Sequence, residues 1–161
     1  MSPNRTSLEL TSDREIVIRR TFRAPPSVVF EAWTKPEFVK RWWAPASRGA
    51  AVIECDADVR PGGEYRYVTA VGPGQRFAFF GKYLEIVPPT RLVYTQVFEP
   101  YPDAEVVVTV SFEERDGSTL LVAREVYPSK EALEGAMASG MEEGLRETFD
   151  QLDALVASAR G

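Results

Sequence analysis

The sequence has no histidine among its 161 residues. Histidine is the commonest metal ligand and general base, so its absence argues against zinc hydrolysis and against nucleophilic catalysis by Ser-His or Cys-His pairs. We therefore expect no metal site, no cofactor and no recognisable catalytic residue. Enzymatic activity stays open, with a binding protein favoured, because acid–base chemistry would have to use Asp, Glu, Tyr, Lys or water.

Disulfides, membrane spans and excess positive charge are missing as well. The single cysteine, Cys55, cannot form an internal disulfide and fits a reducing cytosol, which predicts a cytoplasmic protein. No apolar run approaches the roughly 18 residues of a membrane span, and Met1–Ser12 lacks the apolar core of a signal peptide. The formal net charge is -5, whereas phosphate binding needs a concentrated basic face. We expect neither nucleic acid nor membrane as a partner, and a monomer or a homodimer.

Alternation of apolar and polar residues dominates the middle of the chain. We predict a flexible N-terminus over residues 1–13 and a single domain over residues 14–158. Period-two segments bounded by proline and glycine turns predict strands over Arg14–Arg23, Ala50–Val59, Glu64–Val71, Gln75–Val87, Arg91–Phe98, Glu105–Glu113 and Thr119–Tyr127. Two short helices are expected after the first strand, one with the apolar face Val29, Phe30 and Trp33, and one over Glu37–Trp43.

A helical period replaces the alternation near the C-terminus. The larger apolar residues there recur every three or four positions: Leu133, Met137, Met141, Leu145, Phe149, Leu152 and Val156. This spacing predicts one long helix from Ser129 to about Ala157, with Ser129 as its cap and with Gly140 and Gly144 on the apolar face. The predicted fold is α+β, with a curved antiparallel sheet of about six to seven strands wrapped around the long C-terminal helix.

Five motifs follow one another in this order of elements. They are Phe30–Glu37 (FEAWTKPE), Arg41–Pro45 (RWWAP), Asp58–Tyr65 (DVRPGGEY), Gly81–Leu92 (GKYLEIVPPTRL) and Gly140–Gly144 (GMEEG). With them, the chain from about Glu15 to Val156 resembles the START-like, helix-grip superfamily. Within that superfamily it resembles the family related to the C-terminal domain of activators of the heat-shock protein 90 ATPase.

The resemblance implies a helix-grip fold with an apolar pocket whose use differs between members. It also introduces a chaperone or another protein as an alternative partner. Two positions depart from the pattern of relatives. Leu145 stands where many relatives have tryptophan, and Glu125 stands where a histidine is common.

Aromatic residues at one strand parity are the main candidates for a cavity under the helix. The predicted set is Tyr65, Tyr67, Phe77, Phe79, Tyr94 and Phe98, and the alternative is a packed aromatic core. We expect Val108 on the sheet, Met137, Met141 and Leu145 on the helix, and Trp33, Trp42 and Trp43 near the mouth to complete the lining. A cavity of roughly 300–1,000 Å³ would be typical of a ligand site.

Two polar residues are predicted to point inward with this set, Gln96 and Glu125. Glu125 shares the parity of Leu121 and Ala123, and a carboxyl group inside an apolar cavity has a raised pKa. The alternative for Glu125 is a solvated face or an ion pair with an arginine. The environment of the Glu125 side chain therefore distinguishes a cavity position from a solvated or ion-paired one.

Three functions are compatible with these observations. The favoured one is binding of a small apolar or aromatic molecule between the sheet and the C-terminal helix. The second is a chaperone-associated module resembling an ATPase activator. The third is a cyclase-like or hydrolase-like enzyme that uses a buried carboxylate and tyrosines.

Overall fold

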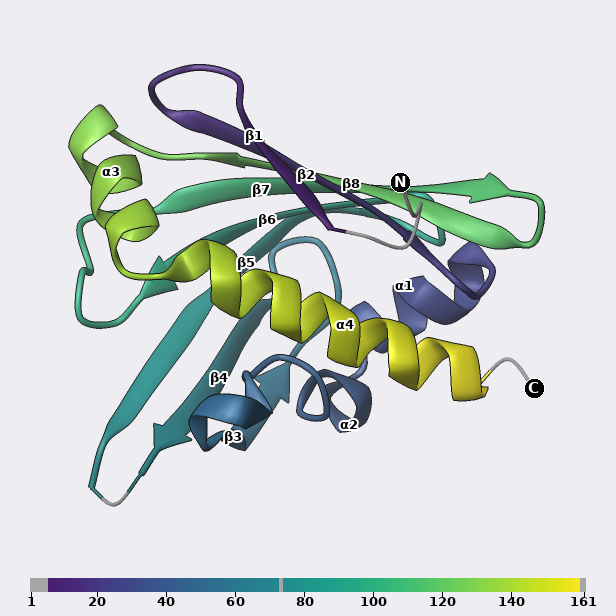
Figure 1. The fold of residues 1–161 in the computed structure, drawn as a ribbon, viewed down its shortest axis with the longest axis horizontal. Helices are drawn as coiled ribbons and strands as arrows, with labels where there is room; N and C mark the ends of the chain where they lie inside the picture. Colours follow the sequence, from purple (N-terminus) through teal and green to yellow (C-terminus); the bar gives the residue numbers. More distant parts are fainter. Residues whose placement is uncertain (1–5, 73, 160–161) are drawn as a thin grey trace.

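An antiparallel sheet of eight strands curves around the last helix in the computed structural model, which describes residues 6–72 and 74–159 (Figure 1). The strands are β1 (Ser7–Leu10), β2 (Glu15–Phe22), β3 (Ala50–Ala57), β4 (Glu64–Val71), β5 (Arg76–Val87), β6 (Arg91–Phe98), β7 (Val106–Arg115) and β8 (Ser118–Val126). They lie side by side in the order β1-β2-β8-β7-β6-β5-β4-β3. The predicted α+β class is confirmed, and the predicted count of six to seven strands is wrong.

Helices cover one side of this sheet. They are α1 (Pro26–Thr34), α2 (Pro36–Val39), a 3₁₀ turn (Ala46–Arg48), α3 (Lys130–Ala138) and α4 (Met141–Ala159). Figure 1 shows α4 crossing the hollow of the curved sheet, with α1 and α2 beside its C-terminal half. This arrangement is consistent with the predicted helix grip.

The additional strand, β1, lies in the segment expected to be an unpatterned, flexible end. It pairs with β2, with Leu10 opposite Ile16. Leu8 is half-buried against the core, whereas Leu10 is exposed. One inward-facing leucine gives too little alternation for a sequence signal, so the strand depends on the edge that β2 offers. Residues 1–5 of the predicted end lie outside the described residues.

The long C-terminal helix is interrupted, which corrects the prediction of one continuous helix. Ser129 caps α3 as expected, because its side chain accepts a hydrogen bond from the Ala132 N–H. Gly140 then has a φ of 86°, a left-handed conformation that ends α3 and that glycine adopts without strain. The apolar spacing continues across the break because both helices turn apolar residues toward the core.

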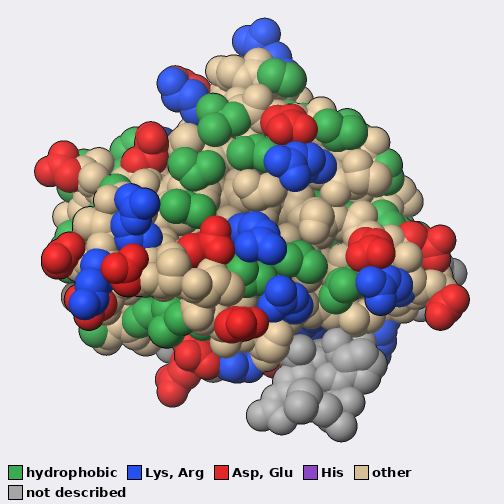
Figure 2. Space-filling view, turned by 90° about the horizontal axis from the view of Figure 1, so that it is seen from above, with side chains coloured by type: hydrophobic (Ala, Val, Ile, Leu, Met, Phe, Trp, Pro, Cys, Tyr) green, Lys and Arg blue, Asp and Glu red, His purple; other side chains and the backbone are tan. Residues whose placement is uncertain are grey.

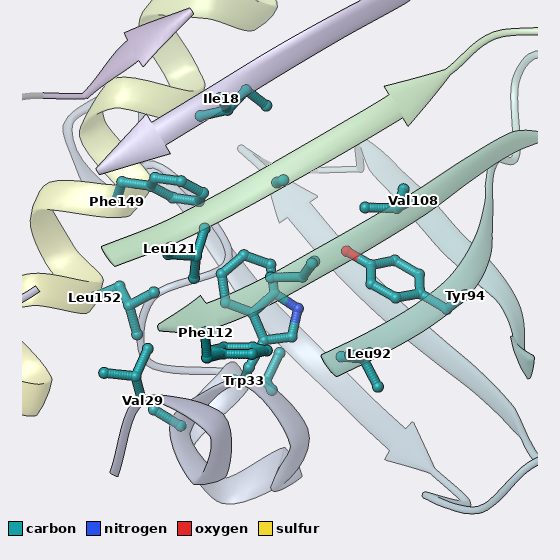
Figure 3. Close-up of a cluster of buried hydrophobic side chains, with 14 of the residues drawn as sticks. Ile18, Val29, Trp33, Leu92, Tyr94, Val108, Phe112, Leu121, Phe149 and Leu152 are labelled. Carbon is teal, nitrogen blue, oxygen red and sulfur yellow. The ribbon is translucent and has the colours of Figure 1, made fainter. Parts of the chain in front are cut away.

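Aromatic packing around Trp33 joins α1 to three other parts of the core. The Trp33 ring lies 4.9 Å from that of Trp42, 5.7 Å from that of Phe149 and 6.1 Å from that of Phe112. These contacts connect α1 with the segment after α2, with α4 and with β7. Figure 3 shows the Trp33 indole between the side chains of Phe149 and Leu152 on α4 and the ring of Tyr94 on β6.

Ion pairs attach the C-terminal half of α4 to β2. The side chains of Arg20 and Asp153 are both about 5% exposed, and Arg20 Nη2 lies 3.5 Å from Asp153 Oδ2. Asp153 also accepts a hydrogen bond of 3.1 Å from the Arg23 backbone N–H, and Arg20 forms a second ion pair with Asp150. A buried charge without its partner costs several kcal/mol, so these pairs fix where α4 lies on the sheet.

The face in Figure 2 looks down on the molecule from the top of Figure 1. Lysine and arginine side chains alternate there with aspartate and glutamate, and hydrophobic side chains lie between them. On this face positive charge is not concentrated in one patch. Among the described residues, no helix is both long enough and apolar enough to cross a membrane.

The backbones of β5 and β6 approach each other closely at Gly81. A β-carbon at Gly81 would lie 2.0 Å from the carbonyl oxygen of Thr95. The Tyr65 hydroxyl donates a hydrogen bond of 2.6 Å to the same oxygen, and the Lys82 N–H donates one of 3.0 Å to Thr95 Oγ1. Glycine is therefore required here by close backbone approach, since its φ is not in the left-handed region.

We expect Gly81→Ala to lower the free energy of unfolding by about 3 kcal/mol, because the backbone of β6 must move to admit the methyl group. Urea denaturation monitored by circular dichroism measures the change. Gly135→Ala is the matched control: it lies in α3 with open space around it and is expected to gain about 0.5–1 kcal/mol from helix propensity. Equal stability of the two variants would contradict the role assigned to Gly81.

Candidate functional site

A pocket of about 200 Å³ lies between the hollow face of the sheet, α4 and the segment that follows α2. It is smaller than the volume expected from the sequence. An apolar cavity of about 150 Å³ is known to hold benzene, so a space of this size fits a molecule with one or two rings. Each of the three walls has a different structural origin.

Side chains at one strand parity form the sheet wall. In the register of the sheet Tyr94 lies opposite Val108, and Val108 lies opposite Glu125. Opposite residues in antiparallel strands point to the same face, so this row of three projects into the hollow. The remaining sheet residues of the wall are Ile18, Thr69, Phe79, Gln96 and Ala123.

One face of α4 forms the second wall. Met141, Leu145 and Thr148 follow one another at spacings of four and three residues, which places them on one side of the helix. Gly144 lies on the same face without a side chain, and Phe149 closes the end next to Trp33. The missing side chain of Gly144 leaves space against the sheet at that turn of the helix.

The third wall is the segment after α2, which contributes Trp42, Trp43, Ala44 and Pro45. Gln151 on α4 holds this segment by donating hydrogen bonds to the carbonyl oxygens of Trp42 at 3.1 Å and Ala44 at 2.9 Å. The side-chain oxygen of Gln151 accepts a hydrogen bond of 2.9 Å from the backbone N–H of Ala46. One glutamine side chain thus ties the tryptophan-bearing wall to the helix wall.

Glu147 adds a second tie one turn before Gln151. Its Oε2 accepts a hydrogen bond of 2.7 Å from the backbone N–H of Ser47, and its Oε1 accepts one from the Ser47 hydroxyl. The indole N–H of Trp42 donates a bond of 2.9 Å to the carbonyl oxygen of Ala32 in α1. The wall after α2 is therefore connected to both α1 and α4.

Glu125 is the ionisable carboxyl group of the pocket. Burial raises its pKa, and the hydrogen bond from the Tyr127 hydroxyl, 3.0 Å from Glu125 Oε1, opposes that rise. The Tyr127 hydroxyl also lies 3.2 Å from the sulfur of Met141. Glu125 is thus half-buried in the pocket rather than on a solvated face, and among the described ion pairs it has no arginine or lysine partner.

The tyrosine hydroxyls near Glu125 stay neutral at ordinary pH. Burial raises the pKa of Tyr94, and the Glu125 carboxylate raises it further. Burial also raises the pKa values of Tyr65 and Tyr127, and the next cause is Tyr94 for Tyr65 and the Glu125 carboxylate for Tyr127. Among these groups Glu125 is the carboxyl group, and burial shifts its titration toward higher pH.

The structure brings most of the predicted site residues to this pocket. Those that line it are Trp33, Trp42, Trp43, Phe79, Tyr94, Gln96, Val108, Glu125, Met141 and Leu145. Sequence reasoning did not select Thr148 or Phe149 for the lining, although the helical spacing from Leu145 contains both. Thr69 was also missed, and its strand parity with Tyr65 and Tyr67 was the available signal.

Two predicted tyrosines lie outside this pocket. Tyr65 and Tyr67 pack with Tyr83 around a separate cavity of about 10 Å³. The ring of Trp43 lies 4.9 Å from that of Tyr67 and separates it from the larger pocket. Tyr65 still contacts the lining residue Tyr94, with ring centroids 5.7 Å apart, so these tyrosines belong to the packed aromatic core next to the pocket.

Three further predicted residues also lie elsewhere. Phe98 stacks on Phe79 with ring centroids 4.9 Å apart, and Phe77 packs against Phe98 at 5.5 Å. These two rings therefore support the sheet wall from beside the pocket. Met137 packs against the core from α3, which the break at Gly140 separates from the pocket face of α4.

Metal ligands do not cluster in the part of the chain that the structure describes: no three His, Cys, Asp or Glu side chains there are placed to hold an ion. Cys55 lies on β3, away from the pocket lining, and burial raises the pKa of its thiol to about 11. A thiol with a raised pKa is a poor nucleophile at neutral pH. Cys55 is best described as a packing residue.

Comparison with known proteins gives one family and a set of solved structures. The family model described as "Activator of Hsp90 ATPase homolog 1-like protein" matches residues 23–157. A protein from Rhodobacter sphaeroides is 26% identical, with a TM-score of 0.88, over 95% of this chain and 99% of that one. No curated protein compared with the chain gives a match.

Two other solved structures share the fold from end to end. A Mycobacterium smegmatis protein is 26% identical, with a TM-score of 0.81, over 94% of this chain and 96% of its own. A Staphylococcus epidermidis protein is 27% identical, with a TM-score of 0.80, over 95% of this chain and 94% of its own. The START-like fold expected from the five motifs is thereby confirmed.

We expect Glu125→Gln to stabilise the protein more at pH 8 than at pH 4.5. The folded protein holds the Glu125 proton to a higher pH than the unfolded chain, whose carboxyl group has the ordinary pKa of 4.5. The folded state thus binds more protons between these two pKa values, so stability falls as pH rises through that window. Glutamine at position 125 has no carboxyl proton to release, so the variant does not lose stability in this way.

Urea denaturation at several pH values measures the difference between wild type and Glu125→Gln. Glu113→Gln is the control, because it removes the same charge from an exposed side chain on β7. A stabilising effect of Glu125→Gln that shrinks as pH rises would contradict the raised pKa.

Proposed function

The chain belongs to the Activator of Hsp90 ATPase homolog 1-like family, and we propose that it binds a small apolar or aromatic molecule in the pocket between α4 and the sheet. The observation that carries this proposal is the composition of the pocket walls. Rings from α1, β5 and β6 and from the segment after α2 meet there: Trp33, Trp42, Trp43, Phe79 and Tyr94.

Aromatic walls favour an aromatic ligand for two reasons. A ring that leaves water for such a pocket gains about 25 cal/mol for each Å² of apolar surface that it buries. Offset or edge-to-face contact with the wall rings adds roughly 0.5–1.5 kcal/mol per pair. Gln96 and Glu125 supply the few polar groups that orient a ligand in an otherwise apolar site.

The sequence around the pocket keeps this space open. Ala123 and Gly144 have small or no side chains where the sheet and α4 face each other. In a packed core, voids larger than a water molecule are few, because empty space forfeits contacts on every side. A cavity of about 200 Å³ next to a tightly packed aromatic cluster therefore supports a role in binding.

We predict that indole binds to the wild-type protein and that Leu145→Trp removes this binding. The larger side chain would occupy the space that the ligand needs, since Leu145 lines the pocket from α4. Isothermal titration calorimetry measures the affinity, which for a fragment of this size should correspond to a dissociation constant of roughly 0.1–1 mM. The affinity should fall by at least about tenfold in the variant.

Leu10→Trp is the matched control for this experiment. It makes the same substitution at an exposed position on β1, outside the pocket lining. Circular dichroism verifies that both variants are folded. Undiminished indole binding by folded Leu145→Trp would place the ligand elsewhere, and no binding by the wild type would contradict the proposal for this class of ligand.

A second candidate function comes from the family description, which names activators of the Hsp90 ATPase. On this proposal the purified protein raises the rate of ATP hydrolysis by Hsp90 from the same organism, with saturation as its concentration increases. A coupled ATPase assay measures the rate, and an inhibitor of Hsp90 provides the background. An unchanged rate across a wide concentration range would contradict this function and leave the ligand proposal untouched.

A further inference from the structure

We propose that the pocket selects small aromatic amines, with the ligand's ammonium group held by Glu125 and its ring held by the surrounding tryptophans. This inference rests on the proposed ligand-binding function and names the chemical class of the ligand. It is argued from the charge, the hydrogen-bonding groups and the rings that the pocket presents.

Charge in the pocket has one sign. Glu125 is a carboxyl group, and neither lysine nor arginine occurs among the described residues that line the space. A ligand carboxylate or phosphate would therefore enter an apolar site without a counter-ion and next to a group of its own charge, which is strongly unfavourable. A ligand cation would find its counter-ion already in place.

The hydrogen-bonding groups also suit an ammonium ion. Such an ion has three N–H donors and accepts nothing. Tyr127 donates to Glu125 Oε1, which leaves the second carboxylate oxygen, Oε2, to accept from a ligand. Gln96 contributes an amide oxygen as a further acceptor in the same pocket. A primary amine can thus satisfy most of its donors without displacing a protein hydrogen bond.

The aromatic rings around the pocket also favour a ligand that carries an ammonium group. A cation within about 6 Å of the centre of a tryptophan face gains roughly 0.5–2 kcal/mol, most where water is excluded. Trp33, Trp42 and Trp43 all line the space, and Phe79 closes it beside Trp43. The ring of an arylalkylamine would stack on these side chains while its amine reaches Glu125 across a short linker.

Electrostatics link this binding to pH. The titratable groups that interact electrostatically with Glu125 are the hydroxyls of Tyr65, Tyr94 and Tyr127, and their raised pKa values keep them neutral where the carboxyl group titrates. An ammonium ion beside Glu125 favours the carboxylate and so lowers its pKa. At a pH where the empty pocket holds Glu125 protonated, binding of the ammonium ion releases one proton to the solvent.

Three probes of nearly equal shape test the proposal: 2-phenylethylamine, 2-phenylethanol and 3-phenylpropanoate. Isothermal titration calorimetry at pH 7.5 should show the amine binding at least about tenfold more tightly than the alcohol, with the carboxylate weakest. In Glu125→Gln the advantage of the amine over the alcohol should disappear. Glu113→Gln removes a carboxylate from the exposed end of β7 and should keep that advantage.

Proton release gives a readout that a change in shape alone would not produce. At a pH where the empty pocket holds Glu125 protonated, titration of the amine in two buffers with different ionisation enthalpies should give different observed enthalpies for the wild type. The two buffers should give the same enthalpy for Glu125→Gln, which has no carboxyl group to release the proton.

The outcomes separate this inference from the function on which it rests. Equal binding of amine and alcohol, or tighter binding of the carboxylate, overturns the inference and leaves aromatic-ligand binding standing. An amine preference that survives in Glu125→Gln also overturns it, because the cation would then be held by another group. Failure of indole and all three probes to bind would remove the proposed function together with the inference.

Discussion

Packing of Trp33 against Phe149 determines how this molecule is built. Their rings lie 5.7 Å apart and connect α1, which follows the second strand, with α4 at the other end of the sequence. Phe112 and Trp42 complete the contact, so the sheet and the segment after α2 are held by the same side chains. Buried aromatic pairs contribute about 0.5–1.5 kcal/mol each beyond the apolar area that they bury. The pocket lies on one side of this cluster and uses Trp33 and Phe149 as its floor, so the core that stabilises the fold also gives the pocket its rigid side.

Local periodicity accounts for what could be predicted from the sequence. Strand parity is a property of neighbouring residues, and it placed Tyr94, Val108 and Glu125 on one face before their register was known. Features that depend on distant partners were missed. The short strand β1 forms because β2 has a free edge, and its own sequence contributes only Leu8 to the core. The break at Gly140 was hidden because the apolar spacing of α3 and α4 continues through it.

Aromatic packing explains the largest error about the site. Tyr65 and Tyr67 have the strand parity expected of the lining, and the Tyr65 ring does lie 5.7 Å from that of Tyr94. Both side chains are nevertheless used in the core, because Trp43 packs on Tyr67 at 4.9 Å and the Tyr65 hydroxyl donates its hydrogen bond to the Thr95 carbonyl oxygen. Such contacts join residues that are far apart in the sequence, and strand parity alone does not reveal them.

The half-buried carboxyl group of Glu125 is the most informative departure from a simple apolar core. A glutamine at position 125 would fill the same volume and keep the bond from Tyr127 without the cost of a desolvated charge. A leucine would remove the polar group altogether. The chain instead carries a carboxyl group that lines the pocket and whose pKa is raised by burial. Ionisable groups with shifted pKa values in a cavity are characteristic of functional sites, which often lower the stability of the fold. Because the neighbouring tyrosines stay neutral and the described lining has no basic residue, the charge that best compensates Glu125 is one that a ligand brings with it.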